Sequence, residues 1–216
     1  MNPPSKPTKK EIVTEFRTRE ILAAARRLMQ SRGVEAVTME EIAAAAGVAK
    51  GTVYLYFQGK EVLVQALISQ VGEQILTDIE AVVAAPGAPP EKIQQVAAVL
   101  LDYLMRERAL FPAYARDILR GGRSAPQTYW LNLQDMEERF VKLVNRVFAE
   151  GIAAGRFIPA DPRLLTFLLR GMVRAVGYYQ MAAGQRKAVE EALPVLLTLL
   201  ASGLTRQPRA AEVGAV

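Results

Sequence analysis

The sequence predicts an all-α protein with a three-helix unit near its N-terminus and a larger helical domain behind it. Apolar residues recur three or four positions apart through most of the chain, and no segment alternates strictly as a half-buried strand would. Glycine and proline clusters separate these periodic segments, as connections between helices require. The segment over 161–183 is apolar nearly all round, which is typical of a helix buried on more than one side, and the last segment is leucine-rich from Leu193 to Leu204.

The first ten residues carry three prolines and three lysines. We expect a flexible basic arm over residues 1–13, either a solvated tail or a contact for nucleic-acid phosphates and the minor groove. A helix is predicted from about Thr14 to Arg32, where the apolar residues form one stripe. Gly33 is well placed to end this helix.

Two short helices are predicted on either side of Gly47. Thr38, followed three residues later by Glu41, forms a capping box that marks the start of the first. Gly47 stands where a left-handed residue ends a helix, and the second helix opens near Val48. Helix, glycine turn and helix make a helix-turn-helix pattern, whose second helix lies in the major groove of DNA. A plain packing hairpin is the alternative.

Candidate DNA-contacting residues gather at the start of the second helix, because that end of a recognition helix lies nearest the base edges. Lys50 can donate to a guanine or a phosphate, and Gly51 allows close approach of the backbone. Tyr56 can reach a phosphate or belong to the core. Lys60 opens the next helix, where its charge and the free backbone N–H groups favour a phosphate. The complete set is Thr38, Ala49, Lys50, Gly51, Thr52, Tyr54, Tyr56 and Lys60.

The distribution of charge agrees with a DNA-facing N-terminal unit. Residues 1–60 hold ten Lys and Arg against six Asp and Glu, a net charge of +4, whereas the remainder holds seventeen against sixteen, a net charge of +1. A basic excess on one module is the electrostatic requirement for binding a polyanion. Improved solubility alone is the plain alternative.

Composition excludes several function classes. The chain has neither cysteine nor histidine, so disulfides, thiol chemistry, the commonest general base and the commonest metal ligand are all absent. An enzyme could still use carboxylates or lysine, but the usual hydrolase triads cannot be built. We expect no catalytic residues, no metal site, no cofactor and no enzymatic activity. No apolar run reaches the ~18–20 residues of a membrane span, and the N-terminus lacks a secretory signal, so a cytoplasmic location is expected.

Six further helices are predicted after the helix-turn-helix, and the last contains Pro194, which should kink it. The final two exceed what one monomer easily covers. Gly171, Ala175 and Gly177 would let another helix approach, so we infer a homodimer through a four-helix interface, with an ordinary monomer core as the alternative. The six are expected at about 60–84, 90–107, 110–120, 125–154, 161–183 and 186–205.

The segment from Ile42 to Leu63, IA-x-x-AGV-x-x-G-x-x-Y-x-YF-x-x-KE-x-L, resembles the tetracycline-repressor (TetR) family of bacterial regulators. Ala49 stands where that family often has serine, which puts one hydroxyl contact in doubt. The resemblance implies a homodimeric repressor that binds an inverted-repeat operator in double-stranded DNA and is released by a small, largely apolar organic effector. It also implies the same DNA-contacting residues and a helix over 60–84 that transmits effector binding.

On this basis the domains are expected at 14–60 for the helix-turn-helix DNA-binding domain and 61–207 for a helical regulatory and dimerisation domain, with a frayed tail over 208–216. Candidate effector-lining residues are Tyr103, Phe111, Tyr114, Trp130, Phe167, Arg170, Met172 and Arg174; for those other than the two arginines, plain core is the favoured interpretation. For Arg170 and Arg174 we favour pairing with carboxylates over binding an anionic ligand.

Three rival functions stay open at this point. An activator, or a DNA-organising protein without an inducer, would share the helix-turn-helix. An all-helical enzyme would use that motif only for packing, against which the missing histidine and cysteine count. A protein-interaction module would bind its partner with little dependence on salt.

Overall fold

A computed structural model describes residues 8–119, 126–183 and 187–204, which form α-helices and their connections with no strand among them. These residues divide into two compact units. The first contains 8–71 and the described part of 107–130, and the second contains 72–106 and the described part of 131–204. No helix in the described part of the chain is long and apolar enough to cross a membrane.

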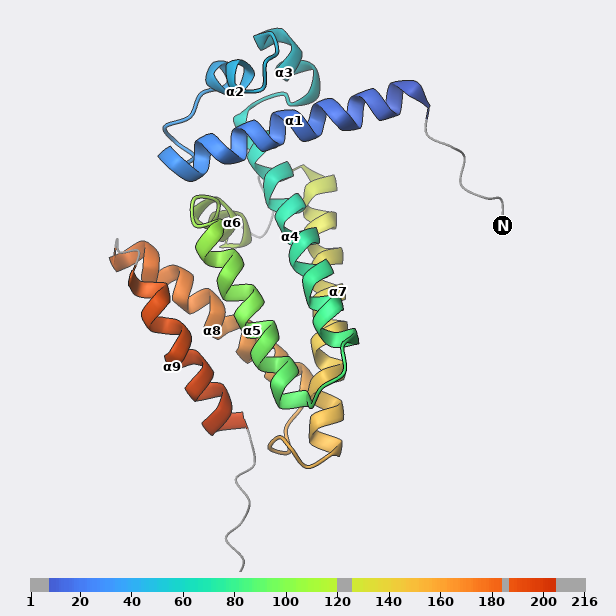
Figure 1. Ribbon diagram of the computed structural model, residues 1–216, viewed down its shortest axis with the longest axis vertical. Coiled ribbons are helices and arrows are strands. Elements are labelled where there is room, and N and C mark those ends of the chain that lie inside the picture. Colours follow the sequence, from blue (N-terminus) through green and yellow to red (C-terminus); the bar gives the residue numbers. More distant parts are fainter. Residues whose placement is uncertain (1–7, 120–125, 184–186, 205–216) are drawn as a thin grey trace, which may run out of the picture. The chain divides into compact units, whose positions relative to one another are not determined.

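The first unit is built on a three-helix arrangement in which α2 packs against both α1 and α3 (Figure 1). Its helices are α1 (Lys9–Arg32), α2 (Met39–Ala45), α3 (Lys50–Tyr56), the first half of α4 (Lys60–Ala84), and α6 (Phe111–Leu119). Ile21, Met29, Ile42 and Val53 are fully buried and form the centre of its core. We call residues 8–71 of this unit the head.

Local chemistry sets the helix-turn-helix geometry as predicted. Thr38 and Glu41 complete both halves of the capping box at the start of α2. Gly47 has a φ of 67°, a left-handed conformation that favours glycine. The N–H of Val48 donates to the carbonyl of Ala43 at 3.0 Å, which closes the turn after α2 as a Schellman motif.

The start of α1 corrects the expected arm. The helix begins at Lys9 because Thr8 and Glu11 form a second capping box, in which the Thr8 N–H donates to the Glu11 carboxylate at 2.7 Å. Residues 9–13 are therefore helical, and 1–7 lie outside the described residues. The expected domain boundary at 60/61 stays a prediction; the two compact units divide after Val71, and the described part of 107–130 belongs to the same unit as the head.

The second unit is a helical bundle in which α5 packs against α8 and α9, and these two pack against each other. Helix α9 continues through Pro194, and the hydroxyl of Thr198 donates to the Pro194 carbonyl at 2.8 Å. The expected tail over 208–216 lies outside the described residues. The helices of this unit are the second half of α4, α5 (Pro89–Arg106), most of α7 (Gln127–Ala153), α8 (Pro162–Ala183) and α9 (Lys187–Leu204).

Candidate nucleic-acid interface

The outer surface of α3 carries the predicted base-reading residues. Ala49 is the N-cap, with extended backbone and no side-chain capping bond, and Val53 turns inward to a fully buried position. Ala49, Lys50, Gly51 and Tyr54 are exposed, while Thr52 and Tyr56 are half-buried. Ala49, Lys50, Gly51 and Thr52 therefore lie together at the accessible start of α3, whereas Tyr56 is its last residue.

Gly51 is not required by the packing of the chain itself. A Cβ built on this residue would meet no atom within 4 Å, and the backbone is ordinary helix rather than left-handed. Glycine in a helix costs about 0.5–1 kcal/mol of stability relative to alanine. The open space therefore suits an outside partner that approaches the α3 backbone.

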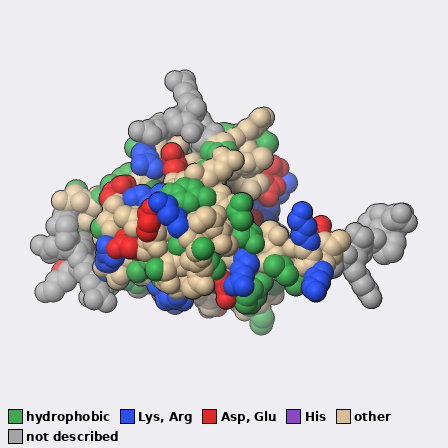
Figure 2. All heavy atoms as spheres, turned by 90° about the horizontal axis from the view of Figure 1, so that it is seen from above, with side chains coloured by type: hydrophobic (Ala, Val, Ile, Leu, Met, Phe, Trp, Pro, Cys, Tyr) green, Lys and Arg blue, Asp and Glu red, His purple; other side chains and the backbone are tan. Residues whose placement is uncertain are grey.

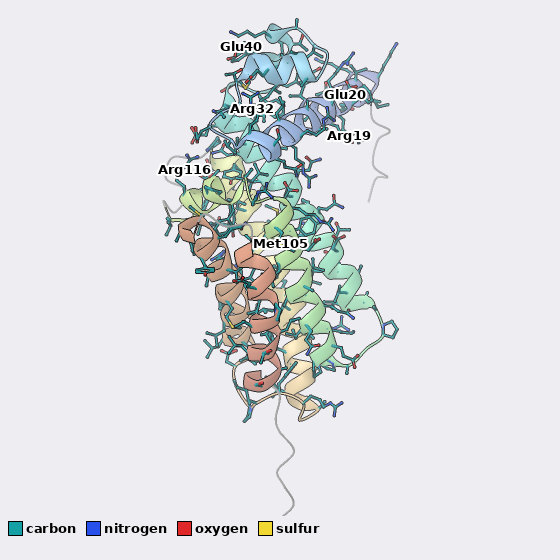
Figure 3. All side chains as sticks on the ribbon, turned by 60° about the vertical axis from the view of Figure 1, so that its left-hand side comes forward. Arg19, Glu20, Arg32, Glu40, Met105 and Arg116 are labelled. Atoms are coloured by element: carbon teal, nitrogen blue, oxygen red, sulfur yellow. The ribbon has the colours of Figure 1, made fainter. Side chains whose placement is uncertain are left out.

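Lys50 is engaged on this surface before any partner arrives. Its ammonium pairs with the carboxylate of Glu40 on α2 and lies 5.9 Å from the centre of the Tyr54 ring. The bond between them lowers the pKa of Glu40 and raises the pKa of Lys50. Glu40 lies at the outer edge of the head (Figure 3). Figure 2 shows that basic and acidic side chains are interspersed on this side of the molecule.

Thr38 and Lys60 both have structural roles at the base of the motif. Thr38 caps α2 and remains exposed. The ammonium of Lys60 donates to the carbonyls of Val34 and Glu35 at 3.1 Å each, and to that of Val37 at 3.3 Å. This bonding holds the segment between α1 and α2 against the start of α4. A phosphate at Lys60 would have to share an ammonium that already has three backbone acceptors.

A buried ion pair that the sequence analysis missed ties the head to the segment after α5. Glu107, whose side chain is 6% exposed, accepts from Arg26 Nε at 3.0 Å and from a second Arg26 nitrogen. The Gln30 amide also donates to it, at 3.2 and 3.3 Å. We call Arg26, Gln30 and Glu107 the α1 clasp. The residues it joins are about eighty positions apart, so local periodicity gave no signal for it.

Two protein-family descriptions match successive parts of the chain. Residues 21–67 match the family described as bacterial regulatory proteins, tetR family, and residues 86–190 match the tetracyclin repressor-like C-terminal domain.

The chain belongs to the TetR family. A TetR-type relative, the HTH-type transcriptional repressor KstR2 of Mycolicibacterium smegmatis, is 24% identical over 140 residues, which are 65% of this chain and 67% of the relative.

Two solved structures share the fold. The ketosteroid transcriptional regulator KstR2 of Mycobacterium tuberculosis has a TM-score of 0.67 at 23% identity and covers 88% of this chain and 96% of its own. The regulator FadR from Bacillus subtilis, solved in complex with stearoyl-CoA, has a TM-score of 0.65 at 22% identity. The match covers 86% of this chain and 98% of the FadR chain. The predicted all-α TetR architecture is thus confirmed.

The predicted effector-lining residues of this TetR-family chain are distributed over both compact units. Phe111 and Tyr114 are neighbours on α6, with ring centres 6.2 Å apart, and the half-buried Trp130 belongs to the same unit. Tyr103 belongs to the second unit and donates its hydroxyl to Asp78 at 2.7 Å.

On α8, Arg170 pairs with Glu137 of α7, as the preferred ion-pair interpretation expects. Arg170 also lies over the ring of Phe167, 5.0 Å from its centre. Phe167 is 43% exposed, so in this chain it lies on an outer surface rather than among buried residues. Met172 and Arg174 are half-buried on the same helix.

An apolar stripe runs along the accessible side of α8 and α9. Leu168 is 51% exposed, and the small residues Gly171 and Ala175 continue the stripe at helical spacing. Gly177, predicted to join them, is buried and does not belong to this surface. We call this surface the α8–α9 stripe. Its exposed large side chains are Leu164, Phe167, Leu168, Tyr178, Tyr179, Met181, Val195 and Leu199.

Proposed function

We propose that this TetR-family chain is a ligand-responsive transcriptional repressor that binds an inverted-repeat operator as a homodimer. A small, largely apolar organic effector releases it. The observation that carries the DNA-binding part is the accessible start of α3, where Gly51 leaves open space beside Lys50 and Thr52. A recognition helix contacts bases with this end.

Support for the homodimer comes from the α8–α9 stripe. Large apolar side chains gathered over two neighbouring helices form the kind of exposed patch that marks an interface. Gly171 would meet nothing within 4 Å if it carried a Cβ, which suits close approach of a second helix. Two copies of the stripe related by a twofold axis would form the proposed four-helix interface. The two heads would then read half-sites one helical turn, ~34–36 Å, or a multiple apart.

The effector proposal draws on one buried group and one structural relative. Gln65 of α4 is 3% exposed, and neither its amide nitrogen nor its oxygen has a hydrogen-bond partner in the described residues. Buried amides without partners are rare, so a polar group of a bound effector is a natural partner for Gln65. The stearoyl-CoA bound to FadR makes a long acyl chain with a polar head our candidate effector class.

Stearoyl-CoA is a suitable first probe of this effector proposal. We expect it to lower operator affinity in the wild type. Gln65→Leu should raise the stability of the ligand-free protein, because it removes an unsatisfied buried amide, but should weaken the response to stearoyl-CoA. Absence of any response to acyl-CoA compounds would favour the alternative of an activator or DNA-organising protein without an inducer.

The decisive test of DNA recognition is selection from random duplex DNA at near-physiological salt. We expect an enriched inverted repeat. Neutralising roughly 6–10 phosphates should reduce affinity about 10³–10⁵-fold between 50 and 200 mM salt. Enrichment of no sequence, together with weak salt-sensitive binding, would contradict the operator proposal and favour a non-specific DNA organiser.

A further inference from the structure

Glu40 places a negative charge beside the residue proposed to read bases. Its side chain is 54% exposed and pairs with Lys50, whose side chain is 57% exposed, so both groups are accessible to an approaching duplex. A carboxylate near the phosphates of DNA opposes binding of every sequence. Glu40 therefore does not increase the affinity of this surface for DNA, and another role must explain its presence.

The capping of α2 does not supply that role, although a carboxylate in the first turn, as Glu40 is, also favours the helix dipole. The hydrogen bonds that cap this helix come from Thr38 and Glu41, and Glu40 contributes none of them. Glu41 also holds Arg32 of α1 at 2.8 Å, so the packing of α2 on α1 has its own ion pair. The recorded partner of Glu40 is Lys50 on α3.

The chemistry of lysine shows what such a partner can do. The ammonium ends a flexible four-carbon chain and has three N–H donors. Left alone, it would turn toward the nearest phosphate, which every sequence offers and which carries no sequence information. Glu40 pairs with it, and the Tyr54 ring lies 5.9 Å away, at the start of α3. The ammonium can keep one donor on Glu40 and direct another to the N7 or O6 of guanine.

We propose that Glu40 is a positioning residue that makes Lys50 select guanine rather than phosphate, so that Glu40 sets the sequence specificity of the head. The proposal rests on the proposed function, in which α3 faces the base edges. It assigns Glu40 no contact with DNA, because it acts through Lys50. The lowered pKa of Glu40 means that the pair stays charged throughout the neutral range.

The test compares Glu40→Gln with the wild type on two duplexes: the sequence enriched by selection and a scrambled duplex of equal length and composition. We expect affinity for the scrambled duplex to rise about two- to fivefold, the range of an exposed ion pair. Affinity for the selected duplex should rise less, so that the ratio of selected to scrambled affinity falls. The salt dependence on the scrambled duplex should steepen by about one counterion, because Lys50 then reaches a phosphate.

Two controls separate positioning from simple loss of charge. Glu15→Gln removes an exposed carboxylate that pairs with Arg19 on α1, and it should leave the affinity ratio unchanged. Introducing Glu40→Gln into a Lys50→Ala background should also leave that ratio unchanged, because the residue through which Glu40 acts is gone. Thermal unfolding of Glu40→Gln should match the wild type.

The possible failures are distinguishable. Suppose that the wild type prefers the selected duplex. If Glu40→Gln leaves the ratio of selected to scrambled affinity unchanged, or lowers it equally with and without Lys50, the role of Glu40 is overturned and the proposed function stays intact. A wild type that binds both duplexes alike would overturn the operator proposal and the role of Glu40 with it.

Discussion

The start of α3 and the α8–α9 stripe are both exposed helix surfaces, yet their chemistry is opposite. The α3 surface presents a lysine, a threonine and small residues, whereas the stripe presents leucines, aromatic rings and valine. The first suits a hydrated polyanion, and the second suits another apolar helix. Exposure alone therefore identifies no partner, and the kind of side chain that is exposed does.

Glycines on these two surfaces have more space around them than a glycine packed inside the fold. Gly51 and Gly171 lie inside helices on these two surfaces, and a Cβ on either would meet nothing within 4 Å. Gly151 differs, because its Cβ would lie 2.2 Å from the Phe157 ring. Packing within the chain explains Gly151 but not the other two. A helical glycine that its own fold does not need points to a partner outside the chain.

The largest effect is expected from placing a charge in the α8–α9 stripe. Leu168→Glu should raise the dimer dissociation constant at least about 100-fold, because the carboxylate would be buried without a partner. Operator affinity should fall with it. Sedimentation velocity measures the dissociation, and Leu131→Glu, at an exposed leucine of α7, is the matched control that should remain dimeric. Equal dimer dissociation constants for the two variants would mean that the stripe is not the dimer interface.

Gly51→Ala should separate binding from stability. We expect the free energy of unfolding to rise by about 0.5–1 kcal/mol, because alanine is the better helix former. Operator affinity should fall at least about tenfold, the loss typical of a misplaced base contact. Denaturant unfolding and titration of the selected duplex check the two effects. Unchanged affinity would mean that DNA does not approach the α3 backbone here.

Lys50 and Lys60 should respond differently to truncation. Lys60→Ala should lower the free energy of unfolding by about 1–2 kcal/mol, because three backbone carbonyls lose their charged donor. It should weaken binding to all operator variants alike. Lys50→Ala should instead change which variants are preferred. An equal loss across variants for both substitutions would contradict this division of roles.

The smallest effect is an acid sensitivity of the head. The Thr38 backbone N–H, followed by Arg32, lowers the pKa of Glu41 from 4.5 to about 2. A depressed carboxyl pKa stabilises the fold above pH 4.5, and that stabilisation is lost as the pH falls from 4.5 toward 2. Urea midpoints measured across this range should fall, and Glu41→Gln should flatten the decline. A decline equally steep in the variant would assign it to other carboxylates.

The sequence was sufficient wherever the decisive chemistry is local. Capping boxes and glycine turns act over three to five residues, so α2, α3 and the start of α4 lie where the pattern predicts. The box at Thr8 follows the same rule but was overlooked beside the prolines. Side-chain partners were less accessible to prediction, because the acceptors of Lys60 lie about twenty-five residues away. The burial of Gly177 depends on the rotation of α8 in the bundle, which spacing within one helix does not determine.

The α1 clasp limits how the N-terminal segment can be exchanged between family members by recombination. Glu107 lies beyond α5 in the chain, yet it pairs with Arg26 and belongs to the same compact unit as the head. A chimaera that joined residues 1–71 to the remainder of another family member would leave Arg26 facing a foreign residue. A recombinant that keeps this ion pair must therefore transfer two segments, 1–71 and 107–130, and the second lies within residues 86–190, which match the tetracyclin repressor-like C-terminal domain.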